Sequence, residues 1–384
     1  MKKYLATILL ILVLTPNFVF AEEPSVTAEQ TIKDQVFEAK VIEILAEKTI
    51  TREDGSTAIQ QNLKLRGLNR DFKDKEFIFN GISDLQVMSA FQAEKGDKVV
   101  VAYSIGEDGA GTFYVTDFVR RGYLYLLAII FSVVIVLIGK KQGFKSLISL
   151  VLTFVVIMKY IVPKIAAGEN PLFVSIVGSV AILAVIIYLT WGFKLKAHIG
   201  LFSILLSLII TGLISVFFTK ITELTGLSDE NAMFLVGLSK TAINFNGLLL
   251  AGIILGTVGV LDDVVISQIS SVEQLSTANK SWKFRELYKS AMRVGVDHIS
   301  SMTNTLFLAY AGASLPLLLL FNLNSGPFVN FSQIINNEAM ATEIVRTLTG
   351  SIGLMLAMPL STLIAARYYI MKQGSAKSKT QNSN

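Results

Sequence analysis

Seven long apolar stretches decide what this chain can fold into. Each holds roughly the 20 residues that an α-helix needs to cross the hydrocarbon core of a bilayer. The stretches cover residues 122–140, 146–167, 171–192, 199–219, 247–269, 301–322 and 344–366. Over all 384 residues, 52% are hydrophobic and only 16% are charged, which suits a chain that lies mostly in a lipid bilayer. The sequence therefore predicts an α-helical polytopic membrane protein, with a bundle of seven helices between residues 121 and 370.

Two further parts precede this bundle. Residues 1–21 have a basic start, an apolar centre and a small-residue cleavage site, which is the pattern of a signal peptide; whether it is cleaved stays open. Residues 22–120 contain short β-rich runs separated by turn dipeptides, so we expect a small extracytoplasmic all-β domain. A barrel of the oligonucleotide/oligosaccharide-binding type is one arrangement that fits. The runs are 36–44, 63–66, 76–79 and 98–103, and the turns lie at 54–55, 80–81, 95–96 and 108–109.

The charges between the apolar stretches predict the orientation. Lys and Arg cluster in alternate connections, whereas the other connections carry mostly Asp and Glu. Because cytoplasmic loops carry the excess of Lys and Arg, we expect the basic side and the tail 371–384 in the cytoplasm of a bacterium. The β domain then lies outside the cytoplasmic membrane. The basic clusters are 140–145, 194–196, 280–293 and 367–379, and the acidic residues are Glu169, Glu223, Asp229, Glu230 and Glu338.

Several classes of function are disfavoured by composition. The net charge of +5 comes mostly from the loop clusters, so it does not predict binding to nucleic acid. Arg120 and Arg121 are basic residues on the outer side, where we expect them to snorkel toward the lipid headgroups. The chain has no cysteine, which excludes disulfides and thiolate metal sites. It has no HExxH motif and no Ser/His pairing at depth, so we expect no enzyme, no metal ion and no cofactor.

Asp262 and Asp263 stand inside the fifth apolar stretch. A carboxylate at that depth costs roughly 3 kcal/mol, so it rarely faces lipid and often belongs to an ion or proton pathway. Helical spacing puts Gly252, Gly256 and Gly259 on the same face as Asp263, and small residues let helices approach closely in lipid. We therefore expect this face to be packed, with Asp263 as the protonatable group and Asp262 as its neighbour. In the alternative interpretation, the pair only hydrogen-bonds a neighbouring helix or caps a break in its own.

Polar residues near the start of the sixth stretch are candidates to join this site. Asp297 and His298 precede the stretch, and the histidine is expected either to relay protons or to cap the helix. Thr303, Asn304 and Thr305 would lie near the level of the aspartate pair if the fifth and sixth helices are antiparallel neighbours. We expect at least one of them to hydrogen-bond that pair.

Two other features concern charge near the bundle. Arg346 and Lys159 are candidate counter-charges for the aspartate pair, although snorkelling to the outer surface explains them equally well. Residues 281–293, between the fifth and sixth stretches, have one apolar side and one cationic side. We expect this amphipathic connector to lie on the inner leaflet, where cations favour anionic lipid.

Two longer motifs carry a resemblance to a known family. They are Gly259-Val-Leu-Asp-Asp-Val264 and the stretch from Asp297-His-Ile-Ser-Ser-Met-Thr-Asn-Thr305 to Leu315. Together with the exported β domain and the apolar bundle, they make nearly the whole chain resemble the YibE/YibF-like family of bacterial membrane proteins. This resemblance implies the architecture but assigns no biochemical activity.

A partial resemblance concerns residues 245–366, which look like the last three helices of a SecD/SecF-type half of the resistance-nodulation-division superfamily. Thr257-Val-Gly-Val-Leu-Asp-Asp263 is similar to the aspartate-bearing helix of that superfamily, which implies that Asp263 takes part in a proton flow that drives export. The usual Asn two positions later is Val265 here, and two helices are extra. Since such an assembly has two halves, the resemblance also implies a homodimer or a related membrane chain as partner.

Two functions stay open at this point. The leading hypothesis is transport, or assistance to export, coupled to a proton or cation gradient through Asp263 and Asp262. The other is a non-transporting membrane scaffold whose β domain binds an envelope partner. Intramembrane proteolysis is disfavoured, because its two carboxylates usually come from facing helices, whereas these are adjacent on one helix. The sequence leaves open the transported substrate and its direction, the coupling ion, the oligomeric state and the conformation of residues 233–246.

Overall fold

The computed structural model describes residues 35–51, 57–82, 92–105, 111–238, 242–322 and 330–381. The chain divides into two compact units, Met1–Ile130 and Phe131–Asn384. The predicted signal peptide, the predicted turns at 54–55 and 108–109, and residues 239–241 of the segment 233–246 lie outside the described residues.

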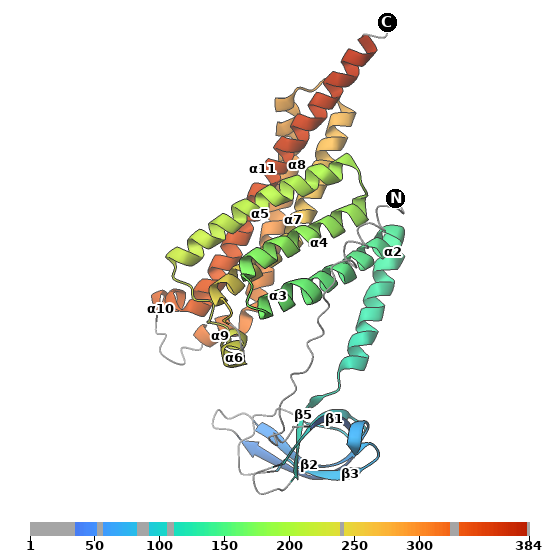
Figure 1. The fold of residues 1–384 in the computed structure, drawn as a ribbon, viewed down its shortest axis with the longest axis vertical. Coiled ribbons are helices and arrows are strands. Elements are labelled where there is room, and N and C mark those ends of the chain that lie inside the picture. Colours follow the sequence, from blue (N-terminus) through green and yellow to red (C-terminus); the bar gives the residue numbers. More distant parts are fainter. Residues whose placement is uncertain are drawn as a thin grey trace. The chain divides into compact units, whose positions relative to one another are not determined.

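Within its described residues, the first unit contains five antiparallel strands. They are β1 (Gln35–Thr51), β2 (Thr57–Gly67), β3 (Glu76–Asn80), β4 (Lys98–Ile105) and β5 (Gly111–Phe118). Their order in the sheet is β3-β2-β1-β4-β5, and β3 also contacts β5, so the sheet curls into a closed barrel (Figure 1). Phe77 of β3 and Phe113 of β5 stack across the closure, with 4.3 Å between ring centroids. This five-stranded barrel agrees with the oligonucleotide/oligosaccharide-binding type that fits the sequence.

The barrel core follows from the alternation of side chains along β1. Phe37, Ala39 and Val41 point inward and are at most 2% exposed, whereas the residues between them are more exposed. Phe72, from the short helix η1 (Arg70–Phe72), stacks on Phe37 with 4.3 Å between centroids and adds to the core. The four predicted β runs fall inside β1 to β4. The prediction lacks β5, because that strand mixes Thr and Asp with aromatic residues and has no long aliphatic run.

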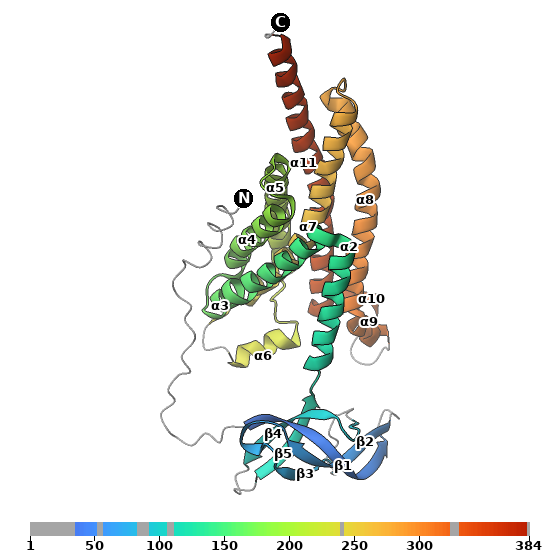
Figure 2. The ribbon, with the colours of Figure 1, turned by 90° about the vertical axis from the view of Figure 1, so that its right-hand side faces the viewer.

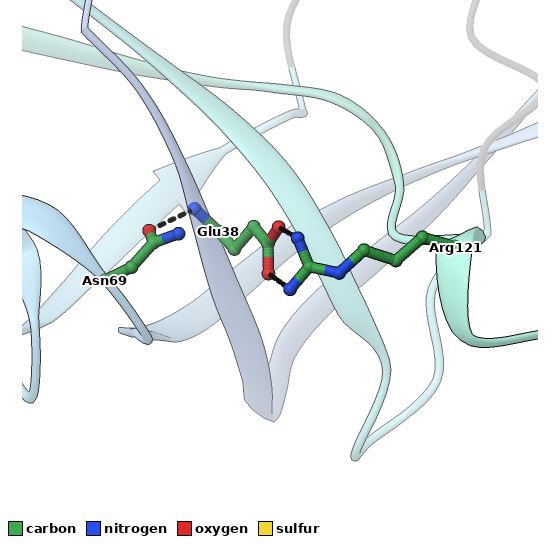
Figure 3. Close-up of polar contacts among 3 residues, drawn as sticks. All are labelled: Glu38, Asn69 and Arg121. Atoms are coloured by element: carbon green, nitrogen blue, oxygen red, sulfur yellow. Dashed lines mark hydrogen bonds and ion pairs between the residues drawn. The ribbon is translucent and has the colours of Figure 1, made fainter. Parts of the chain in front are cut away.

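Two ion pairs tie the barrel to the start of the first helix. Arg121 donates to both carboxylate oxygens of Glu38 on β1, one of them at 2.9 Å (Figure 3). The backbone N–H of Glu38 donates to Asn69 Oδ1 at 2.8 Å. Arg120 Nη1 lies 2.5 Å from Asp117 Oδ1. The expectation that both arginines snorkel toward lipid headgroups is therefore wrong, because carboxylates of the β domain lie close enough to pair with them.

Helices make up the rest of the described chain. They are α2 (Arg121–Val156), α3 (Val162–Ala166), α4 (Pro171–Trp191), α5 (Leu195–Ile221), α6 (Glu230–Leu238), α7 (Phe245–Ala278), α8 (Phe284–Ala313), α9 (Leu315–Asn322), α10 (Phe331–Asn336) and α11 (Glu338–Gln381). Five of the described helical segments are long and apolar enough to cross a membrane. These are Arg121–Ala166, Pro171–Trp191, Leu195–Ile221, Phe245–Ala278 and Glu338–Gly374.

The first of these segments holds the first two predicted helices. It changes direction at Lys140, whose φ of 49° and ψ of −128° are not helical. Gly143 lies inside the bend, where a Cβ would come within 2.0 Å of the carbonyl oxygen of Ile135. A π-helical turn, η2 (Ile157–Ile161), joins α2 to α3. The two predicted helices are therefore joined by a sharp bend that glycine permits, and the predicted loop between them is absent from this described part of the chain.

The predicted sixth helix, 301–322, is wrong in its bounds. The structure instead has α8 followed by α9, with the break at Ser314. α8 combines the predicted amphipathic connector with the first part of the predicted helix. It is not among the segments apolar enough to cross a membrane, because polar residues occupy its middle. In place of seven separate apolar helices, the described residues contain five apolar segments, of which the first is bent.

The amphipathic connector is also placed differently from its prediction. Its apolar residues Leu287 and Ala291 are fully buried. They belong to the core of the second unit, and α8 packs against both α7 and α11. The apolar side of this segment therefore faces protein and is not free to lie in the inner leaflet, because α7 and α11 cover it.

α7 is the central helix of the second unit. It packs against α4, α5, α8 and α11. Figure 2 shows α7, α8 and α11 running side by side, and Figure 1 shows α4 and α5 crossing them. The buried face of α7 carries bulky aliphatic side chains, which are Ile254, Val258, Leu261, Val265 and Ile269. A wide aliphatic stripe of this kind is what drives a helix into the middle of a bundle.

Basic and acidic connections gather at opposite ends of the helical unit. At one end, Lys196 Nζ lies 3.8 Å from Glu273 Oε2, and Gln373 Nε2 donates to Ser276 O at 2.7 Å. These contacts bring together the ends of α5, α7 and α11 that carry basic clusters. At the other end, Glu338 Oε1 accepts hydrogen bonds from the acidic α5–α6 connection. The alternation of charge along the sequence is thus a separation of charge in space.

Candidate functional site

The two aspartates lie within α7 at different exposures. Asp262 is half-buried, whereas Asp263 is exposed on the surface of the helical unit. Asp263 shares its face with Gly252, Gly256 and Gly259, which are exposed as well. The helical spacing predicted from the sequence therefore holds, but the packing expected from it does not.

The glycine face is open in the single chain. Apart from the backbone of α7 itself and the adjacent residues, no atom of the described residues lies within 4 Å of a Cβ placed at Gly252 or Gly259, and at Gly256 the Tyr310 hydroxyl lies at 2.8 Å. The prediction that these glycines pack helices together within this chain is therefore wrong for Gly252 and Gly259, as far as the described residues extend. The reason is that α7 buries its bulky face, and the small residues that receive it lie on α5. At Gly200 of α5, a Cβ would come within 2.5 Å of the side chain of Ile266.

His298 of the neighbouring helix α8 reaches this face near Asp263. Its Nε2 lies 3.5 Å from Ser267 Oγ, one turn beyond Asp263 on α7. It is also close enough to interact electrostatically with Asp263. Asp263, Ser267 and His298 are hereafter called the acid–histidine cluster. Two antiparallel helices supply it, as expected, but the contact is made by His298 and not by the threonines.

The other polar residues predicted for this site take different positions. Thr303 Oγ1 is buried and has no hydrogen-bond partner within the described residues. Asn304 and Thr305 are exposed, and Thr305 Oγ1 donates to a carbonyl of its own helix at 3.1 Å. None of the three hydrogen-bonds Asp263 among the described residues. Asp297 is exposed beside His298.

The two candidate counter-charges lie on different elements of the helical unit. Arg346 Nη1 pairs with Glu343 at 3.1 Å on its own helix. α11 places Gly350 against Thr257, and from these contacts Arg346 lies about 14 Å along the helix axis from the aspartate pair. Lys159 lies in η2, which packs against α4. Arg346 therefore pairs with Glu343 of its own helix, and the counter-charge role of Lys159 stays a prediction beside the snorkelling interpretation.

A buried amide beside the cluster was missed by the sequence interpretation. Gln268 is 3% exposed, and its Nε2 donates to Ala291 O on α8 at 3.0 Å and to Thr362 Oγ1 on α11 at 2.7 Å. It thereby fixes α7, α8 and α11 to one another next to Ser267. Its signal in the sequence is an uncharged amide within an apolar helix, which seldom stays without a partner in a bundle.

A ladder of hydroxyl groups on α5 was missed as well. Its members recur every four residues and are at most 1% exposed; they are Ser203, Ser207, Thr211, Ser215 and Thr219. The first four donate to the carbonyl oxygen four residues earlier, at 2.8 or 2.9 Å. At Gly353 of α11, a Cβ would lie 2.0 Å from Thr211 Oγ1. α5 and α11 therefore approach each other closely at this point, and the four-residue spacing could have indicated it.

The side chains of this cluster are of types that can exchange protons or bind a cation. Ionisable side chains inside membrane helices commonly belong to proton relays and ion paths. A carboxylate, a hydroxyl and an imidazole can pass a proton along hydrogen bonds, and the carboxylate can bind a cation. Among the described residues, no group of three or more Asp, Glu and His side chains is placed to hold a metal ion.

Comparison with known proteins gives a family for the chain. A search of curated proteins and a search of solved structures each found no match. The family model for YibE/F-like protein matches residues 127–371, which covers the helical part from α2 to α11 and includes the acid–histidine cluster. Because the match extends over more than half of the chain, this membrane protein belongs to the YibE/F-like family.

Proposed function

We propose that this protein couples the movement of a proton or cation to transport, or to assistance of export, across the bacterial cytoplasmic membrane. The observation that carries the proposal is the contact at 3.5 Å between Ser267 Oγ and His298 Nε2, which brings an imidazole to within one helical turn of Asp263 on an apolar helix. A carboxylate inside a membrane helix costs roughly 3 kcal/mol, and an imidazole beside it adds a second ionisable group. Such a pair is more readily explained by exchange of a charge than by helix packing.

Each residue of the cluster has a proposed role. Asp263 takes up the proton or cation, because it is the exposed carboxylate of the pair. His298 exchanges the proton with it. The Ser267 hydroxyl, which donates to the Val264 carbonyl oxygen at 3.1 Å, holds the imidazole near this face through its contact at 3.5 Å. Gln268 is a positioning residue that holds α8 and α11 against α7. Asp262, half-buried, influences the charge on its neighbour.

The proposed orientation places the β domain outside the cell. It rests on the basic connections, which gather at one end of the helical unit. Since cytoplasmic loops carry the excess of Lys and Arg, that end is assigned to the cytoplasm. The C-terminal residues of α11 then lie inside, and the cytoplasmic membrane is the proposed location.

The second candidate function is a membrane scaffold. The closed barrel and its ion pair to α2 favour it, because a barrel held to the first helix is suited to present an outer surface to an envelope partner. In this case the aspartates would only support helix association. The two candidates differ in whether a charge crosses the membrane.

The test is ion flux into liposomes that contain the purified protein, under an imposed pH gradient with candidate cations present. We expect Asp263→Asn to abolish flux and His298→Gln to reduce it, while both variants fold and express normally. Asp229→Asn, an exposed carboxylate beside α6, is the matched control and should keep the flux of the unmodified protein.

Unchanged flux in Asp263→Asn would refute the proposal. A larger loss in Asp262→Asn than in Asp263→Asn would contradict the assignment of roles within the pair. No flux in the unmodified protein with every cation tested would favour the scaffold.

A further inference from the structure

One polar face of the helical unit has no cover within the described chain. Its exposed residues are Gly252, Gly259, Asp263 and Ser267 on α7, with His298 and Ser301 on α8. They are hereafter called the open face. Figure 2 shows α7 and α8 side by side, with α8 at the edge of the helical unit. The residues of the open face therefore lie on two neighbouring helices, and at Gly256, between Gly252 and Gly259, the Tyr310 hydroxyl of α8 comes within 2.8 Å of a Cβ position.

Lipid is a poor cover for the open face. A carboxylate and an imidazole that face hydrocarbon lack the hydrogen-bond partners that water or protein would supply. α8 is also too polar to count among the segments suited to cross a membrane. Glycines at Gly252 and Gly259 leave room for another backbone to approach closely. The open face thus has the space for a helix and the polar groups to bind one.

We infer that the occupant is a second copy of this chain, with its α7 against α7 of the first. Two copies inserted with the same orientation are related by a rotation axis along the membrane normal, so residues at equal depth meet. Gly259 then meets Gly259, and Asp263 of each copy comes near His298 of the other. Because the open face carries both an acceptor carboxylate and donor groups, it is complementary to itself.

The dimer would complete the proposed site. Each acid–histidine cluster would be shielded from lipid by the other, and each carboxylate would gain a second imidazole. This inference therefore rests on the proposed function and names the partner of the same site. It also explains why α7 has Gly252 and Gly259 at positions where no neighbouring side chain of the described chain comes within 4 Å of a Cβ.

The first arm of α2, residues 121–139, is the competing occupant within the chain. After Arg121 this arm carries no charged side chain, so it offers Asp263 no counter-charge. Its composition suits contact with lipid, whereas a second copy supplies an imidazole and hydroxyl groups. The second copy is therefore the better cover.

The absence of cysteine from the chain makes the test direct. Single variants Gly252→Cys and Gly259→Cys are oxidised in native membranes and analysed for covalent dimers on denaturing gels. Both cysteines fit without a clash, since nothing lies within 4 Å of a Cβ at either position. Leu213→Cys, at a position 66% exposed on α5, is the control for random collisions in the membrane. We expect a dimer band at both glycine positions and none at Leu213.

Equal cross-linking at all three positions, or none at either glycine position, would overturn the inference. A cross-link within one chain between Gly259→Cys and Leu126→Cys would also overturn it, because α2 would then cover the open face. Copies with two different tags provide a second measurement, since a dimer must copurify them. Dimers that carry no ion flux would contradict the proposed function but support the dimer. Ion flux from a monomer would contradict the dimer but support the proposed function.

Discussion

At the scale of single residues, the room around each glycine decides what it does. The glycines of α7 and the glycine at 353 of α11 all lie in apolar helices, and the sequence does not distinguish them. In the structure, Gly252 and Gly259 face open space, whereas Gly353 touches Thr211. Gly353 is therefore the one of these three that the fold of the single chain requires.

Replacing Gly353 tests this difference. Gly353→Ala puts a Cβ within 2.0 Å of Thr211 Oγ1, so the α5–α11 contact must open. We expect the free energy of unfolding to fall by about 1–3 kcal/mol, because an overpacked interface costs more than the gain in helix propensity returns. The measurement is denaturant unfolding in detergent, followed by the fluorescence of Trp191 and Trp282.

The control is Gly374→Ala on the same helix, where a Cβ meets nothing within 4 Å. It should leave stability unchanged or raise it slightly. Equal effects of the two substitutions would mean that the α5–α11 contact is less tight than the structure has it.

At the scale of elements, the position of the amphipathic segment shows what a local pattern predicts and what it does not. Residues 284–293 of this segment are helical and two-sided, as their sequence indicates. The same apolar side could cover lipid or other helices, and the sequence contains no local signal that separates the two. The structure buries Leu287 and Ala291 against protein, so the segment extends α8.

The substitution Leu287→Ala measures that packing. Leu287 is fully buried, so we expect a local loss of about 2–5 kcal/mol. Hydrogen exchange should rise in peptides from the first turns of α8 and from the part of α11 that packs on it. Arg285→Ala, an exposed neighbour, should leave exchange unchanged. If exchange instead depended on anionic lipid and not on Leu287, the surface-bound interpretation would be correct.

The rest of the fold also divides into features that local sequence patterns predict and features that they do not predict. The long apolar stretches and four of the strands could be predicted, because length, alternation and turn dipeptides are local properties. The strand order, the bend at Lys140 and the partner of Asp263 depend on contacts between distant residues. Helical spacing correctly placed Asp263 on the glycine face, but it gave no information on whether another helix covers that face.

At the scale of the whole molecule, the distribution of charge is the feature from which its orientation can be tested. The basic ends of α5, α7 and α11 meet, and the acidic connections lie at the other end of the helical unit. Loops with an excess of Lys and Arg stay on the cytoplasmic side of a membrane, so this separation of charge predicts how the protein is oriented. The direction in which the acid–histidine cluster would exchange a charge depends on this orientation.

Labelling of single cysteines tests the orientation in cells. Glu230→Cys lies at the start of α6 near the acidic end, and Lys280→Cys lies between α7 and α8 at the basic end; both positions are exposed. A membrane-impermeant maleimide added to spheroplasts should label Glu230→Cys directly and Lys280→Cys only after permeabilisation. The reverse pattern would place the basic end outside, against the positive-inside rule, and would put the β domain in the cytoplasm. The acid–histidine cluster would then meet the opposite side of the proton gradient, so the direction of the proposed coupling would also be reversed.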